Sequence, residues 1–112
     1  MTSRLHRSKD IRAVIAARRS ARGRSLTVHA RDRGDADPVR ATVVAGRKVG
    51  GAVQRNRAKR RLRALLQADG PPTGTDLILV ATPAAVDVPF ASLTEEYTDL
   101  RTRAIARPGS AG

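Results

Sequence analysis

The stretch from Ala45 to Leu66, AGRKVGGAVQRNRAKRRLRALL, constrains the fold of this chain more than any other part of the sequence. Apolar side chains in its second half recur at the i, i+4, i+7 and i+8 spacing of one helical stripe: Ala58, Leu62, Leu65 and Leu66. A helix with a single apolar stripe must bury it against a second layer of structure. We therefore predict a central helix over Ala52–Ala68 that packs on a sheet and ends at the turn-forming residues Asp69–Gly74.

The solvent face of this predicted helix is strongly basic. Six basic residues occupy nine consecutive positions, and four of them, Arg57, Lys59, Arg60 and Arg63, lie off the apolar stripe. The 112-residue chain carries 22 Lys and Arg against 10 Asp and Glu, yet residues 38–68 contain no acid. This clustering favours a face that binds polyanions, because guanidinium groups donate paired hydrogen bonds to phosphates. A merely solvated basic face is the weaker alternative.

Residues that could carry out catalysis are scarce. Cysteine is absent, which excludes disulfides, zinc ribbons and cysteine nucleophiles, and the two histidines do not have a metal-binding spacing. Gly46 and Gly51 match the outer spacing of a phosphate-binding loop, but the Lys and Ser/Thr that such a loop needs do not follow. Asp32, Asp35 and Asp37 lack the further ligands of a metal loop and indicate a solvated turn. We expect neither a catalytic residue nor a metal site on this chain.

The sequence also indicates a location away from membranes. The longest uninterrupted apolar runs, 13–17 and 77–81, contain five residues each, far short of the ~20 needed to span a bilayer. Basic residues interrupt and follow the first apolar stretch, which is not typical of a signal peptide. We therefore expect a cytoplasmic protein with no membrane partner.

Periodicity and turn signals predict the other elements. We expect a helix that Ser8 caps and that ends near Arg19, and a polar turn over Asp32–Pro38. A loop should cover Pro83–Pro89, and Ser92 and Glu95 should form a capping box for the last helix. The predicted strands are Leu26–Ala30, Ala41–Ala45 and Asp76–Ala81, and the apolar stripe of the last helix is Leu93, Tyr97, Leu100 and Ala104.

This order of elements, α-β-β-α-β-α, predicts an α+β fold: a two-layer sandwich of one small mixed sheet with about three helices. The strand at Asp76–Ala81 should be buried on both faces and could run parallel to the strand at Ala41–Ala45. We expect one domain over residues 1–106, followed by a flexible tail at 107–112.

Several motifs resemble, in order, those of the bacterial ribonuclease P protein component. The central one is Arg55-Asn56-Arg57 with Lys59-Arg60, preceded by Arg47-Lys48-Val49-Gly50 and Ala52-Val53. The entry Leu5-x-x-Ser8-x-Asp10, the late strand over 76–84 and the final helix over 93–103 are similar as well.

The resemblance implies a cytoplasmic ribonucleoprotein, an endoribonuclease (a hydrolase) that removes the 5′ leader from precursor tRNA. In that family the RNA subunit carries the catalytic site and binds the Mg²⁺ ions. The protein broadens the substrate specificity of the ribozyme and needs no obligate protein partner. The strand–helix–strand crossover would be left-handed, against the usual rule.

Two groups of site residues follow. The residues expected to bind the catalytic RNA are Arg47, Lys48, Arg55, Asn56, Arg57, Lys59, Arg60 and Arg63. The residues expected to bind the single-stranded leader, in a cleft between the first helix and the sheet, are Ile11, Ile15, Thr27 and His29. The family usually has Phe at the two Ile positions, so base stacking in the cleft should be weaker here. It usually has Ser at the position of Gly46, so a hydroxyl donor is missing beside Arg47 and Lys48.

Other classes of protein share part of this pattern. An architectural, ribosomal-type RNA-binding protein without a role in tRNA processing would have the same charge, size and lack of catalytic residues. A nonspecific DNA binder is a second alternative. An amphipathic membrane-surface protein is a third, but the apolar stripe of the central helix has no aromatic residue to anchor it at an interface.

Overall fold

One mixed sheet of five strands organises the chain in the computed structural model, which describes residues 3–68 and 73–106. The strand order is β1-β4-β5-β3-β2. The strands are β1 (Ser3–Arg4), β2 (Arg19–Arg22), β3 (Leu26–Asp32), β4 (Arg40–Val44) and β5 (Thr75–Ala81). The helices are α1 (Ser8–Ala16), α2 (Ala52–Ala68) and α3 (Phe90–Ala106), with short 3-10 turns η1 (Arg47–Val49) and η2 (Pro83–Val86).

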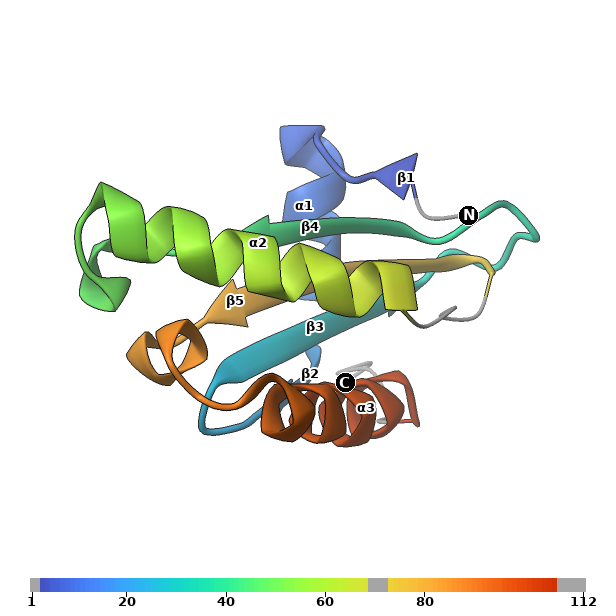
Figure 1. Cartoon of the computed structure of the whole chain (residues 1–112). Coiled ribbons are helices and arrows are strands. Elements are labelled where there is room, and N and C mark those ends of the chain that lie inside the picture. Colours follow the sequence, from blue (N-terminus) through green and yellow to red (C-terminus); the bar gives the residue numbers. More distant parts are fainter. Residues whose placement is uncertain (1–2, 69–72, 107–112) are drawn as a thin grey trace.

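The helices lie on both faces of this sheet (Figure 1), which confirms the predicted α+β class with three helices on one mixed sheet. The predicted two-layer arrangement is wrong, because α1 covers the second face of the sheet and adds a third layer. The face under α2 and α3 carries the main core, in which Leu77 and Leu79 of β5 are fully buried. On the opposite face α1 covers a smaller cluster of Leu5, Val14 and Ile78. The central strand β5 is therefore buried on both faces, as its apolar run predicts.

The crossover from β4 through α2 to β5 has the hand that the resemblance implies. The two strands pair in parallel, with Arg40 opposite Asp76 and Val44 opposite Val80. In Figure 1 α2 lies in front of the sheet, both strands run to the left, and β5 lies below β4. That arrangement is a left-handed crossover, whereas nearly all such units are right-handed.

The N-terminal half differs from the sequence prediction in four respects. The helix ends at Ala16 rather than near Arg19, and Arg18 takes a positive φ of 54°. The chain then forms β2, which was not predicted and which pairs antiparallel with β3. The predicted Ser8 cap is also wrong, because Arg7 is the N-cap residue and makes no side-chain capping bond. The short edge strand β1 was not predicted either.

The capping box predicted for the last helix is wrong as well. Helix α3 begins at Phe90, and the backbone N–H of Leu93 donates to the carbonyl oxygen of Pro89, so Ser92 and Glu95 lie inside the helix. The predicted apolar stripe of α3 is nevertheless buried. The predicted tail at 107–112 lies outside the described residues.

Candidate nucleic-acid interface

Helix α2 has the two faces that its sequence predicts. Its apolar stripe of Ala58, Leu62, Leu65 and Leu66 is buried in the main core. Of the residues expected to bind RNA, Arg55 and Lys59 are half-buried. The exposed ones are Asn56, Arg57, Arg60 and Arg63 on α2, and Arg47 and Lys48 on η1. The structure therefore brings all eight residues onto two consecutive elements, and we call them the η1–α2 surface.

A tight turn joins the two parts of the η1–α2 surface. Val49 is buried and anchors η1, while Gly50 takes a φ of +141°, which side chains disfavour. A Cβ atom on Gly50 would also lie 2.9 Å from the Cβ of Gln54. Glycine at this position thus lets the chain turn directly from η1 into α2 and keeps Arg47 and Lys48 beside the start of the helix.

Two arginines of α2 donate hydrogen bonds to backbone carbonyl oxygens in and after η2. The Nε of Arg57 donates to the carbonyl oxygen of Val86 at 2.8 Å, although the side chain remains exposed. Arg61 donates to the carbonyl oxygens of Ala85, at 2.8 Å, and of Val88, and its guanidinium lies 6.0 Å from the ring centre of Phe90. Arg61 therefore attaches α2 to the segment around η2, and its position beside the apolar stripe was the sequence signal for this role.

The residues expected to bind the leader gather on the sheet face that α1 partly covers. Thr27 and His29 of β3 are half-buried and lie opposite Val80 and Ile78 of β5, which pack on the α1 side. Ile11 is half-buried against the Leu5 cluster, and Ile15 is 53% exposed. We call Ile11, Ile15, Thr27 and His29 the α1-side surface.

The chemistry of the α1-side surface is apolar and weakly polar. Burial lowers the pKa of His29 below its ordinary value of 6.5, which favours the neutral form of the ring at pH 7. The chain contains one Phe, one Tyr and no Trp. Tyr97 is buried in the main core under α3, and Phe90 lies beside Arg61. No aromatic ring is therefore present on the α1-side surface, as the sequence predicts.

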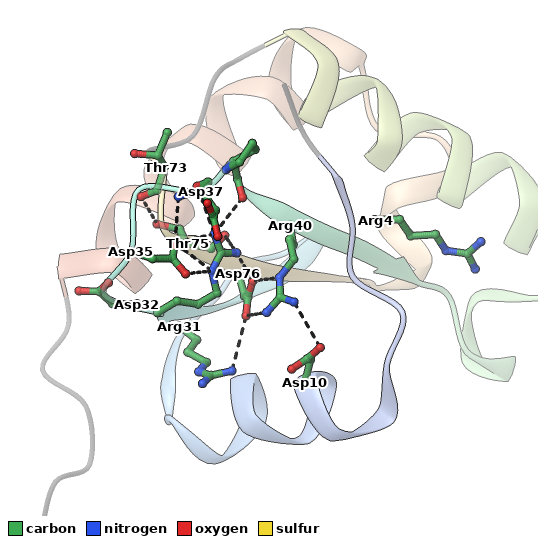
Figure 2. A network of polar contacts seen from close by, with 12 residues as sticks. Arg4, Asp10, Arg31, Asp32, Asp35, Asp37, Arg40, Thr73, Thr75 and Asp76 are labelled. Carbon is green, nitrogen blue, oxygen red and sulfur yellow. Dashed lines mark hydrogen bonds and ion pairs between the residues drawn. The ribbon is translucent and has the colours of Figure 1, made fainter.

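A buried charge network, which the sequence prediction did not include, lies at the start of β5 (Figure 2). The carboxylate of Asp76 is fully buried and accepts hydrogen bonds from Arg33 at 2.6 Å and from Arg40 at 2.8 Å on each oxygen. Arg31 lies 3.7 Å away. Arg40 also reaches Asp10 on α1 at 3.3 Å. In the sequence, the only sign of this network was the single carboxylate of Asp76 in an otherwise apolar run of an arginine-rich chain.

The network keeps Asp76 ionised and organises the turn between β3 and β4. Burial raises the pKa of Asp76, but hydrogen bonds from Arg40 and Arg33 and their charges lower it by more, so the pKa lies below its ordinary value. Arg33 further donates to Asp35 and to the carbonyl oxygens of Asp37 and Pro38. The aspartates of this loop thus belong to a polar turn, as predicted.

Residues 3–68 and 73–106 show neither a metal cluster nor a membrane span. No three His, Asp or Glu side chains in these ranges come together in a way that could hold a metal ion. Within the same ranges, no helix has the length and apolar character needed to cross a membrane.

Comparisons with known proteins agree with this geometry. The "Ribonuclease P protein component" of Symbiobacterium thermophilum is 38% identical over 103 residues, covering 90% of each chain. That of Acidothermus cellulolyticus is 38% identical over 112 residues, covering 97% of this chain and 93% of its own. The RNase P protein from Thermotoga maritima has the same fold, with a TM-score of 0.76 at 24% identity over 89% of this chain and 96% of that one. The Staphylococcus aureus RNase P protein gives a TM-score of 0.75 at 21% identity, over 88% and 92%. Since the family model described as Ribonuclease P also matches residues 1–105, the chain belongs to the ribonuclease P family.

Proposed function

We propose that this chain is the protein subunit of a bacterial ribonuclease P, which removes the 5′ leader from precursor tRNA. The observation that carries the proposal is the η1–α2 surface, a basic surface that lies in a stretch of 31 residues, 38–68, without an acid. Because the apolar stripe of α2 is buried, the helix cannot rotate, and its basic side chains must point outward.

The η1–α2 surface would bind the catalytic RNA. Planar guanidinium groups match the geometry of phosphates and also stack on bases, so arginine suits RNA better than lysine does at such positions. Exposed Arg60 and Arg63 are one turn apart and extend this surface along the helix. Each phosphate they neutralise would release counterions, and binding should therefore weaken steeply with salt.

The α1-side surface would hold the single-stranded leader. Support comes from its position, since Ile15 and His29 lie on the same side of the sheet. Without aromatic stacking, worth about 1–3 kcal/mol per base, the grip on leader bases would be weaker than on an aromatic platform.

In this proposal the RNA subunit holds the hydrolytic site and the Mg²⁺ ions, and the protein supplies cationic side chains. Magnesium prefers oxygen ligands, whereas the η1–α2 surface presents guanidinium and ammonium groups. The cytoplasmic location expected from the sequence remains a prediction.

Reconstitution tests the proposed function. The protein is added to ribonuclease P RNA at low Mg²⁺, and cleavage of precursor tRNA is followed. We expect cleavage to rise when protein and RNA are combined, because cationic side chains relieve repulsion between the two RNAs. RNA binding without any stimulation of cleavage would instead identify an architectural RNA-binding protein. Cleavage by a nuclease-free preparation of the protein alone would refute the assignment of catalysis to the RNA.

A further inference from the structure

The attachment of α1 to the sheet depends on a small set of side chains. The helix has nine residues, too few to be stable without tertiary contacts. Its apolar contact is the small cluster of Val14 with Leu5 and Ile78, against which Ile11 packs. This cluster, together with the flanking strands β1 and β2, which pair with β4 and β3, fixes where the helix sits on the sheet. A second attachment, at the first turn, would further restrict the angle between α1 and the sheet.

Arg40 provides this second attachment. Its Nε and Nη2 bind the two oxygens of Asp76, each at 2.8 Å, so the guanidinium is held in one plane by a buried carboxylate. Its Nη1 is thereby directed at Asp10, whose Oδ2 lies 3.3 Å away in the first turn of α1 (Figure 2). The chain of ion pairs Asp76–Arg40–Asp10 thus joins β5, β4 and α1.

The attachment acts on one end of the helix. Asp10 lies in the first turn, whereas Ile15, in the last turn, is 53% exposed. A tilt at the first turn therefore changes the separation between Ile15 and the sheet residues below it. Thr27 and His29 lie on that sheet face and are only half-buried. The ion pair at one end of α1 is thus placed to set the geometry of the α1-side surface at the other.

We propose that Asp10 and Arg40 are positioning residues for the leader: by holding α1 at one angle, they keep the α1-side surface open to a single RNA strand. The inference rests on the proposed function, because it assumes that the leader lies on that surface. Neither residue needs to contact the leader. Asp10 carries a charge of the same sign as the RNA, so a direct contact with phosphate would be unfavourable.

The test compares two ligands with the reconstituted holoenzyme: precursor tRNA and the same tRNA without its leader. The dissociation constant for the leaderless tRNA divided by that for the precursor tRNA measures the leader's contribution to binding. Asp10→Ala should lower this ratio about two- to fivefold, the effect expected of a partly exposed ion pair. Asp10→Glu keeps the charge and should retain more of the ratio than Asp10→Ala does. Affinity for the leaderless tRNA should not change.

A matched control separates positioning from net charge. Asp99→Ala removes the same charge from an exposed ion pair with Arg103 on α3, where the two side chains are 64% and 57% exposed. This variant should leave the ratio unchanged. In the free protein, amide hydrogen exchange of α1 should be faster in Asp10→Ala than in Asp99→Ala, while exchange in α3 stays the same.

Each outcome decides the question. If the unmodified holoenzyme shows no leader dependence, the leader part of the proposed function fails, and the positioning role falls with it. If leader dependence is present but Asp10→Ala leaves it intact, only the positioning role is overturned. This holds even if the variant has a lower melting temperature, because Asp10 also stabilises the positive N-terminal end of the α1 dipole. A lower ratio with unchanged exchange in α1 would overturn it too, because Asp10 would then act by direct contact.

Discussion

Glu96 should be one of the most important residues for the stability of this protein. Its Oε2 accepts the backbone N–H groups of Ser25, at 2.7 Å, and Leu26, at 3.2 Å, both of which belong to fully buried residues. Removing this carboxylate in Glu96→Ala leaves two backbone donors without their acceptor, at about 1–3 kcal/mol each. Because Glu96 is only partly buried, water can replace part of the interaction. We therefore expect a loss of about 2–3 kcal/mol.

Urea unfolding of the free protein measures this loss, and the chain offers a close control. Glu95→Ala removes the same charge from the neighbouring position of α3, which is exposed, and should change the free energy of unfolding by less than about 0.5 kcal/mol. Glu96→Gln keeps an acceptor oxygen and should fall between the two. If Glu96→Ala and Glu95→Ala unfold at the same urea concentration with the same slope, the assigned role of Glu96 is refuted.

Three further predictions concern charge. Asp76→Ala leaves Arg33 and Arg40 without their buried partner and should cost about 3–5 kcal/mol in urea unfolding. Because its pKa lies below the ordinary value, Asp76 stabilises the fold fully above its unfolded pKa, and this stability should be lost progressively as the pH falls from there through the folded pKa. Arg57→Ala combined with Arg60→Ala should flatten the log–log salt dependence of RNA binding by roughly 0.7–0.9 for each phosphate that the variant no longer neutralises, and an unchanged slope would argue against binding of phosphate by these two arginines. Since burial lowers the pKa of His29, this residue is protonated at a higher pH in the unfolded chain than in the folded protein. The free energy of unfolding should therefore fall as the pH drops below 6.5. His29→Gln should remove this dependence, which unfolding titrations across that range would show.

The elements that local spacing defines could be predicted from the sequence. The central helix over Ala52–Ala68 has the predicted bounds, its apolar stripe is buried, and its remaining surface carries the exposed basic side chains. The same holds for the central strand, whose apolar run is buried on both faces. Helical and strand periodicities reflect which face of a single element meets the core, so they can be recognised without knowledge of its partners.

Tertiary structure alone decided the features that depend on distant partners. The strand Arg19–Arg22 has no apolar alternation and forms because it pairs with β3, and the single carboxylate of Asp76 is tolerated because Arg33 and Arg40 converge on it from other segments. The same is true of Glu96, whose two backbone partners lie 70 and 71 positions earlier in the chain. The left-handed crossover was expected only from the resemblance to a family. A strand edge, a buried ion pair and the hand of a connection are properties of pairs of segments, and no local periodicity encodes them.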